Sequence, residues 1–170
     1  MSESDKKDEN DAKTERVDGI EWSAVVDDDA PALADLRVVA MRESLERIGR
    51  FDPQRARDRF LSGFDIGSTR HIVVDGRRVG FVVVIEEPDH HLLDHLYIAP
   101  ECQGRGIGSA TLKRVLAEAD AVGASVRVGA LRESDSNRFY ARHGFELVEQ
   151  AEFDNYYVRK SGRERSGEPA

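Results

Sequence analysis

The sequence contains few residues that crosslink a chain or hold it in a membrane. Its single cysteine, Cys102, excludes a disulfide within the chain and is typical of proteins from reducing compartments. The longest mainly apolar run, residues 79–85, is far shorter than the roughly 18 residues that a membrane-spanning helix needs. Residues 1–16 lack the apolar segment of a signal peptide. We therefore expect a cytoplasmic protein that has no membrane partner.

The sequence also has no excess of basic residues. The 25 Lys and Arg residues are outnumbered by 33 Asp and Glu residues, which gives a formal net charge of −8 at pH 7. Basic surfaces bind nucleic-acid phosphates, so this charge argues against a nucleic-acid partner.

The chain is long enough for one domain with a sizeable core, at 170 residues. Residues 1–17 are charged and polar without periodicity, which predicts a disordered tail. Residues 161–170 have a similar composition and are expected to form a second disordered tail. The folded domain is therefore expected between residues 18 and 160.

The spacing of apolar residues predicts an α/β protein with a mixed sheet and helices on both faces. The expected order is β-α-α-β-β-β-α-β-α-β-β. A tight turn at Asp75 and Gly76 predicts a hairpin within residues 71–84. Leu33, Leu36 and Val39 recur at helical spacing. Further strands are expected near residues 20–26, 91–98, 124–131, 145–150 and 153–160, and helices near residues 29–48, 53–63, 107–121 and 135–144.

A glycine-rich segment, PECQGRGIGSATL at residues 100–112, joins an expected strand to an expected helix. Gly104, Gly106 and Gly108 lack a Cβ, so a ligand can approach the main chain closely. The free N–H groups and the dipole of a helix start attract an anion, most simply a phosphate. The alternative is a tight strand-to-helix connection without a ligand. We expect a phosphate-binding loop.

Two common phosphate-binding motifs do not fit this segment. A Walker loop needs Gly-Lys followed by Ser or Thr, but Gly108 is followed by Ser109 and Ala110. A dinucleotide fingerprint needs a third glycine where Ser109 or Thr111 stands. Both nucleotide-binding classes are therefore disfavoured.

The segment QGRGIG, residues 103–108, matches the Q/R-x-x-G-x-G/A motif of the GCN5-related N-acetyltransferases (GNAT). A second segment, NRFYARHGFELV at residues 137–148, is similar to the second signature of that superfamily, a short helix that carries a tyrosine and ends in Gly-Phe. With the order of elements, the resemblance extends from about Ile20 to Arg159. It implies the GNAT-like acyl-CoA N-acyltransferase fold and an acetyl-CoA-dependent N-acetyltransferase. It also implies acetyl-CoA as co-substrate.

The resemblance further implies which residues bind acetyl-CoA. The main chain of the strand before the loop, at Leu96, Tyr97 and Ile98, is expected to pair with the pantetheine arm and polarise the thioester carbonyl. Asn137 is a candidate for a hydrogen bond to the same arm, although relatives usually place an asparagine further upstream. The loop is expected to bind the pyrophosphate through Gln103, Gly104, Arg105, Gly106, Ile107, Gly108 and Ser109.

Tyr140 occupies the position where the superfamily often places a general acid that protonates the leaving thiolate. A free phenol has a pKa of about 10, so it is able to donate a proton to a thiolate of similar basicity. The alternative is an aromatic side chain that packs beside Phe139.

Acetyl transfer needs a neutral amine, and relatives often carry a base on the strand before the loop. Asp94 and His95 are the candidates, and strand alternation predicts that they lie on opposite faces. Asp94 is expected to share its face with Leu92, Leu96 and Ile98, which makes it the first choice. His95 titrates near neutrality and is the second.

A metal site and a covalent mechanism are both disfavoured. His91 and His95 are separated by about 13 Å along a strand, so they do not form a zinc pair. Cys102 precedes the loop, but no base is evident near it, and the superfamily as a rule transfers the acetyl group directly.

The resemblance places the acceptor between the first helices and the later strand loops. Residues 41–60 mix six arginines there with acids that include Glu43, Glu46 and Asp58. The alternative is a solvated surface with charge pairs. Glu86, Glu87 and Asp89 are candidates for attracting a cationic amine. Residues 155–157 (Asn-Tyr-Tyr) are expected either to line the acceptor pocket or only to pack against neighbouring side chains.

We expect transfer to a primary amine of a small molecule. Two alternatives are an acetyltransferase for protein N-termini or lysines and a non-catalytic module that senses acyl-CoA. A homodimer is a further expectation from the resemblance, because dimers are common among relatives.

Overall fold

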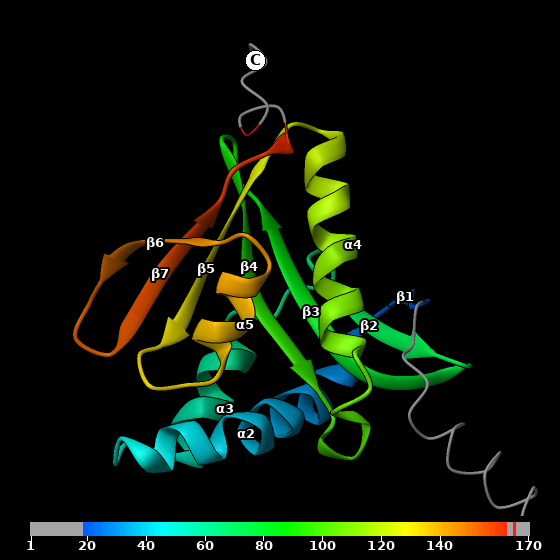
Figure 1. The fold of residues 1–170 in the computed structure, drawn as a ribbon. Helices are drawn as coiled ribbons and strands as arrows, with labels where there is room; N and C mark the ends of the chain where they lie inside the picture. The colour runs from blue at the N-terminus through cyan, green and yellow to red at the C-terminus, as the bar shows by residue number, and fades with distance from the viewer. Residues whose placement is uncertain (1–18, 163–164, 166–170) are drawn as a thin grey trace, which may run out of the picture.

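The computed structural model describes residues 19–162 and 165. The expected tail at residues 1–17 and most of the one at 161–170 lie outside these residues. The described part contains a seven-stranded sheet in the order β1-β2-β3-β4-β5-β7-β6 (Figure 1). No helix among the described residues is long and apolar enough to cross a membrane.

The order of helices and strands matches the order expected from the sequence. Two short 3-10 turns, η1 (Asp27–Asp29) and η2 (Pro100–Cys102), precede the helices α2 and α4. The helices are α2 (Ala30–Arg47), α3 (Pro53–Ser62), α4 (Ile107–Ala121) and α5 (Ser136–Arg142). The strands are β1 (Glu21–Ala24), β2 (Thr69–Val74), β3 (Arg77–Glu86), β4 (His90–Ile98), β5 (Ser125–Leu131), β6 (Glu146–Gln150) and β7 (Asp154–Arg159).

The sheet is mixed, as expected. Strands β1 to β4 pair antiparallel in chain order, and the predicted hairpin turn is present, with Asp75 at φ 50° and Gly76 at φ 76°. Strands β4 and β5 are parallel, because α4 carries the chain back across one face of the sheet. Strand β7 lies between β5 and β6 and is antiparallel to both.

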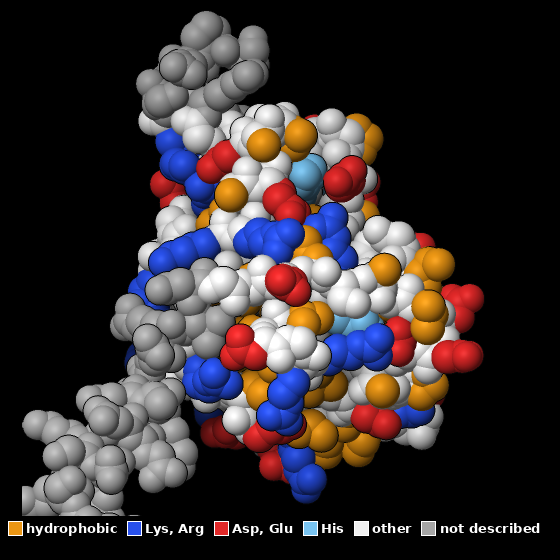
Figure 2. Space-filling model, turned by 90° about the vertical axis from the view of Figure 1, so that its right-hand side faces the viewer, with side chains coloured by type: hydrophobic (Ala, Val, Ile, Leu, Met, Phe, Trp, Pro, Cys, Tyr) orange, Lys and Arg blue, Asp and Glu red, His pale blue; other side chains and the backbone are white. Residues whose placement is uncertain are grey.

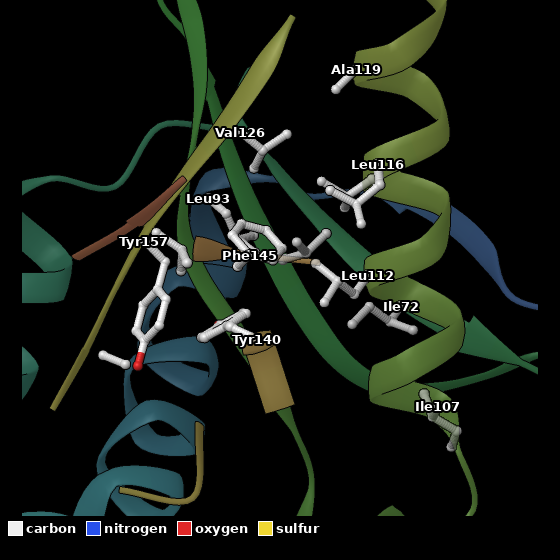
Figure 3. Packing of buried hydrophobic residues seen from close by; sticks show 14 of the residues in the cluster. Ile72, Leu93, Ile107, Leu112, Leu116, Ala119, Val126, Tyr140, Phe145 and Tyr157 are labelled. Atoms are coloured by element: carbon white, nitrogen blue, oxygen red, sulfur yellow. The ribbon is translucent and has the colours of Figure 1, made fainter. Parts of the chain in front are cut away.

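Helix α4 covers one face of the sheet and completes the larger core. Leu112, Leu116 and Ala119 recur at helical spacing and point from α4 toward the sheet (Figure 3). Val126 of β5 and Leu93 of β4 are fully buried opposite them, at 0% and 2% exposure. This packing places the start of α4 beside the end of β4.

Helices α2 and α3 cover the opposite face and form a second core. Leu33 of α2 and Phe60 of α3 pack with Phe81 of β3 in this cluster. Val39, expected in the apolar stripe of α2, is instead 55% exposed, whereas Arg37 is buried. The buried stripe of α2 therefore includes a charged residue.

The packed region continues beyond residue 160, where the second tail was expected to start. Ser161 is 1% exposed, and the main-chain N–H of Gly162 donates to a carboxylate oxygen of Asp120 at 2.9 Å. Arg159 also donates to Asp120, at 2.9 Å from Nη2 to Oδ2. These contacts attach the end of β7 to α4.

The side of the molecule that carries β2 and α4 mixes basic and acidic side chains (Figure 2). Between these two elements, Arg70 pairs with Glu118 at 3.1 Å, and Trp22 of β1 donates to the same carboxylate at 2.8 Å. The guanidinium of Arg114 lies 4.6 Å from the centre of the Trp22 ring. This side is therefore a set of local charge pairs that fasten α4 to the edge of the sheet.

Candidate active site

Strand β4 contains a bulge at Asp94. In the pairing with β3, His95 lies opposite Val83, and Leu93 lies opposite the next residue, Val84. Asp94 thus has no partner residue in β3. An extra residue of this kind interrupts the alternation of side chains and kinks the strand.

The bulge decides which β4 side chains face which helices. Leu93 packs in the core beside α4 together with Leu96 and Ile98, although Leu93 and Leu96 are three residues apart. His95 and Tyr97 face α2 and α3, where their rings lie 5.7 Å apart. The strand thus presents apolar residues to α4 and polar aromatic residues to the other face.

Two expectations about Asp94 are wrong for the same reason. It does not lie in the apolar row with Leu96 and Ile98, because its side chain is 44% exposed. Nor do Asp94 and His95 lie on opposite faces, since the carboxylate Oδ2 and the imidazole Nε2 are 3.5 Å apart. The bulge brings the two candidate bases together as one pair.

Strands β4 and β5 separate beyond the bulge. Their parallel pairing ends where Leu93 lies opposite Val128, so residues 95–98 pair with β3 alone. A cavity of about 1420 Å³ opens at this separation, and its walls come from α2, α3, β4, β5, α5 and the β6–β7 hairpin. It brings together Asp94, His95, Leu96, Tyr97 and Tyr140.

The glycine-rich loop follows the end of β4, as expected. Gly104 and Gly106 have φ angles of 80° and 78°, a left-handed conformation that favours glycine. The side-chain amide of Gln103 donates to the carbonyl of Ile98 at 3.0 Å and ties the loop to β4. No described atom lies within 4 Å of the position that a Cβ on Gly104 would take. The main chain is thus open to a ligand at this point.

The start of α4 offers main-chain donors at the same place. The first hydrogen bond within the helix runs from the N–H of Ala110 to the carbonyl of Gly106, at 3.0 Å. The N–H groups of Ile107, Gly108 and Ser109 precede it and have no acceptor within the helix. An exposed glycine turn that leads into such donors fits the pyrophosphate of coenzyme A.

A serine–histidine contact joins this loop to α5. The imidazole Nδ1 of His143 lies 2.8 Å from the carbonyl of Phe139, which makes Nδ1 the donor and leaves Nε2 as an acceptor. The hydroxyl of Ser109 lies 2.7 Å from Nε2 and donates to it. His143 is not predictable from the sequence, because one histidine before a helix-ending glycine forms no distinctive pattern.

Asn137 is held by the protein itself. Its amide nitrogen donates to the carbonyls of Leu131 and Ser134, at 2.7 and 2.8 Å. Its amide oxygen accepts from Asn155 at 2.9 Å and from the Tyr157 hydroxyl at 2.8 Å. These bonds fasten α5 to β5 and β7. They leave the amide little capacity for the cofactor arm, and cofactor binding by Asn137 stays a prediction.

Tyr140 lies at the wall of the cavity with its ring buried. Its ring centre is 5.3 Å from that of Phe139. It is 5.4 Å from that of Phe145 (Figure 3). Burial raises the pKa of Tyr140, so the phenol stays protonated at neutral pH. Its hydroxyl makes no hydrogen bond to another described residue. Tyr140 thus packs as the alternative reading describes, and its role as a general acid stays a prediction.

His95 lies in a largely apolar pocket. Its ring centre is 5.3 Å from that of Phe60, and its Nδ1 is buried without a hydrogen-bond partner among the described residues. Burial lowers the pKa of His95 to about 4, although the carboxylate of Asp94 opposes this shift. Arg37 and Arg59 lower the pKa further through their positive charge. The imidazole is therefore neutral at neutral pH.

Arg37 is the buried charge of this region. It is 7% exposed and donates from Nη1 to the carbonyl of Ala56 in α3, while its Nε has no partner among the described residues. Arg37 was not among the site residues expected from the sequence. It stands four residues after Leu33, and this helical spacing could have predicted that it lies on the buried face of α2.

The arginine-rich segment, residues 41–60, divides into two groups. One group forms surface pairs: Arg42 with Glu46, Arg47 with Glu43, and Arg57 with Asp35. The other group lines the cavity and consists of Arg50, Arg55 and Arg59. The charge pairs expected for a solvated surface are therefore present in part of the segment, and an acceptor role for the cavity arginines stays a prediction.

The other candidates for the acceptor site also divide into residues that line the cavity and residues that do not. Tyr156 and Tyr157 line the cavity, whereas Asn155 binds Asn137. The acids at residues 86, 87 and 89 are not part of the lining, but Asp89 lies 2.7 Å from the imidazole of His90, which lines the cavity.

Comparison with known proteins agrees with this geometry. Residues 67–147 match a family model described as "Acetyltransferase (GNAT) domain". The chain is 30% identical over 94 residues to an uncharacterized N-acetyltransferase of Escherichia coli, YafP. The alignment covers 51% of this chain and 56% of that protein. It is 35% identical over 99 residues to an uncharacterized N-acetyltransferase of Mycobacterium tuberculosis, Rv2669, which covers 56% of each. The matched part thus spans about half the length of these relatives.

A solved structure extends the likeness over the whole fold. The PaiA N-acetyltransferase of Thermoplasma acidophilum, in complex with coenzyme A, aligns with a TM-score of 0.71 at 16% identity. The alignment covers 84% of this chain and 99% of that one. Together with the glycine loop and the separated strands, these findings identify residues 67–147 as matching the acetyltransferase (GNAT) domain family, within a fold that is similar to that of a solved N-acetyltransferase.

Proposed function

We propose that this protein is an acetyl-CoA-dependent N-acetyltransferase that transfers the acetyl group directly to a primary amine of a small molecule. One observation carries the proposal. Beyond the β4–β5 separation, a single cavity holds an acid–histidine pair and a buried tyrosine, Asp94, His95 and Tyr140. These groups provide a candidate proton acceptor and a candidate proton donor within one cavity.

The loop and β4 support binding of the co-substrate. The N–H groups at the start of α4 bind the pyrophosphate, with the left-handed Gly104 and Gly106 keeping the approach open. The main chain of Leu96, Tyr97 and Ile98 has no strand partner on the β5 side, so it is free to pair with an extended pantetheine arm. Acetyl-CoA supplies the acetyl group as a thioester when bound.

Proton movement is assigned to side chains of the cavity. The Asp94 carboxylate, oriented by the neutral His95, accepts a proton from the acceptor ammonium group, which frees the nitrogen lone pair. The new bond joins this nitrogen to the acetyl carbon as the carbon–sulfur bond breaks. Tyr140 gives its hydroxyl proton to the sulfur.

The test combines turnover with cofactor binding. Thiol release from acetyl-CoA is measured across a panel of amines for the wild type, Tyr140→Phe and Asp94→Asn, and the thermal shift caused by coenzyme A is measured for each. We expect amine-dependent turnover that both substitutions reduce while the thermal shift persists. If coenzyme A stabilises the protein but no amine, peptide N-terminus or lysine raises turnover, the protein is an acyl-CoA sensor instead.

A further inference from the structure

Arginines without carboxylate partners converge on the cavity. Eight arginines of the described residues form ion pairs within 4 Å, and none of them lines the cavity. The arginines that do line it form no such pair with any described residue. These are Arg37, Arg50, Arg55, Arg59 and Arg127.

The charge is concentrated on the side formed by α2 and α3. Arg37 is buried there, and a buried guanidinium without a carboxylate is costly unless an anion compensates it. Arg59 lines the cavity together with His95 and Tyr97, and its positive charge favours a lower pKa for both side chains. Arg55 extends the positive charge along α3.

The acids of the cavity do not neutralise this side. Asp52 accepts the main-chain N–H of Arg55 at 3.1 Å and caps α3, and Asp94 faces His95. Glu149 and Asp154 belong to the far wall, at the β6–β7 hairpin. None of the four lies within ion-pair distance of a lining arginine.

On this basis we propose that the acceptor carries an anionic group, a carboxylate or a phosphate, near its amine and that Arg37, Arg55 and Arg59 bind it. This proposal rests on the proposed acetyltransferase function. A simple cation would be repelled by these arginines, whereas an amine with an attached anion places its nitrogen near Asp94 and its anion on the guanidinium groups. Guanidinium groups bind carboxylate and phosphate oxygens in the same two-bond geometry.

The test compares matched acceptors that differ in one charge. Amino acids are compared with their carboxamides, and O-phosphoethanolamine is compared with ethanolamine, so the two arms distinguish carboxylate from phosphate. We expect at least a tenfold higher kcat/KM for the anionic member of one pair, mainly through KM. Equal or better use of both neutral members would overturn the proposal.

Variants link the preference to the arginines. We expect Arg59→Gln to raise the acceptor KM about tenfold for the anionic member and leave the neutral one unchanged, with Arg59→Lys intermediate. Arg57→Gln is the matched control, because Arg57 lies on the same helix but pairs with Asp35 outside the cavity. A change in the KM for acetyl-CoA instead of the acceptor would assign Arg59 to the co-substrate and contradict the proposal.

A binding measurement separates this proposal from the function on which it rests. The same amines are titrated calorimetrically into the protein saturated with coenzyme A. If no amine is acetylated but the anionic members bind and Arg59→Gln abolishes that binding, the anion site stands and the transferase function fails. If the amines are acetylated or bound without a preference for the anionic members, the anion site is contradicted but the transferase function is not.

Discussion

The carboxylate of Asp94 and the imidazole of His95 lie 3.5 Å apart, although the two residues follow one another in strand β4. Neighbours in a regular strand point to opposite faces, so the contact exists only because Asp94 is the extra residue of a bulge. Asp94 is exposed, whereas the His95 side chain is 16% exposed and packs against Phe60 of α3. The pair therefore connects the open cavity with the aromatic side chains that pack around His95.

Asp94→Asn tests the proton acceptor. We expect kcat/KM for the amine to fall by about 10²-fold or more, because the amide cannot take a proton. The melting temperature is expected to change little, since the side chain is 44% exposed. A matched exposed substitution, Asp58→Asn, is expected to leave turnover unchanged. Steady-state rates between pH 6 and 9 check this, and a wild-type rate for Asp94→Asn would reject the assignment.

Tyr140→Phe tests the proton donor. The ring would keep its packing against Phe139 and Phe145, and the lost hydroxyl has no hydrogen-bond partner among the described residues. We therefore expect nearly unchanged stability and coenzyme A affinity, with kcat lower by about 10²–10³-fold. Tyr157→Phe is the control, because the Tyr157 hydroxyl binds Asn137. If that substitution lowers kcat as much as Tyr140→Phe, proton donation by Tyr140 is not supported.

Gly104→Ala tests the loop as the binding site for coenzyme A. A Cβ at a φ of 80° is expected to cost roughly 1–2 kcal/mol of stability and to narrow the approach to the main chain. Gly123→Ala introduces similar strain at a φ of 71°, at the other end of α4. Calorimetric titration with coenzyme A should show weaker binding for Gly104→Ala alone. Equal weakening in both variants would point to general destabilisation.

The buried His95 predicts how stability depends on pH. Its pKa is lowered to about 4 in the folded protein, below the usual value of about 6.5 in the unfolded chain. The unfolded state therefore binds more protons between these values, and the free energy of unfolding falls as the pH drops from 6.5 toward 4. Between pH 7 and 4.5 this group is expected to remove about 2 kcal/mol.

Urea unfolding at pH 7 and 4.5 checks this dependence. We expect His95→Gln to lose less stability than the wild type over the same interval. The imidazole resonances of His95 provide a direct measurement in the unmodified protein. A midpoint near 6.5 in those spectra would contradict the buried, neutral state.

Local patterns were sufficient to predict much of this protein from its sequence. The hairpin turn at Asp75 and Gly76, the glycine loop and the helix over residues 107–121 depend on contacts between near neighbours, so the sequence predicts them. The two motif segments, together with the order of elements, were enough to predict the superfamily. The placement of Asp94, His95 and Tyr140 at one cavity agrees with the expected site, while their roles stay predictions.

The tertiary structure alone decided how the site is arranged. The bulge at Asp94 depends on the register between β4 and β3, which no pattern within β4 reveals. Arg37 is buried because of the way in which α2 and α3 cover the sheet. The same packing separates the arginines that form ion pairs from the arginines that line the cavity. Asn137 is held by partners from β5 and β7. Periodicity shows which face of an element is buried, but only the packed chain shows which distant residues that face meets.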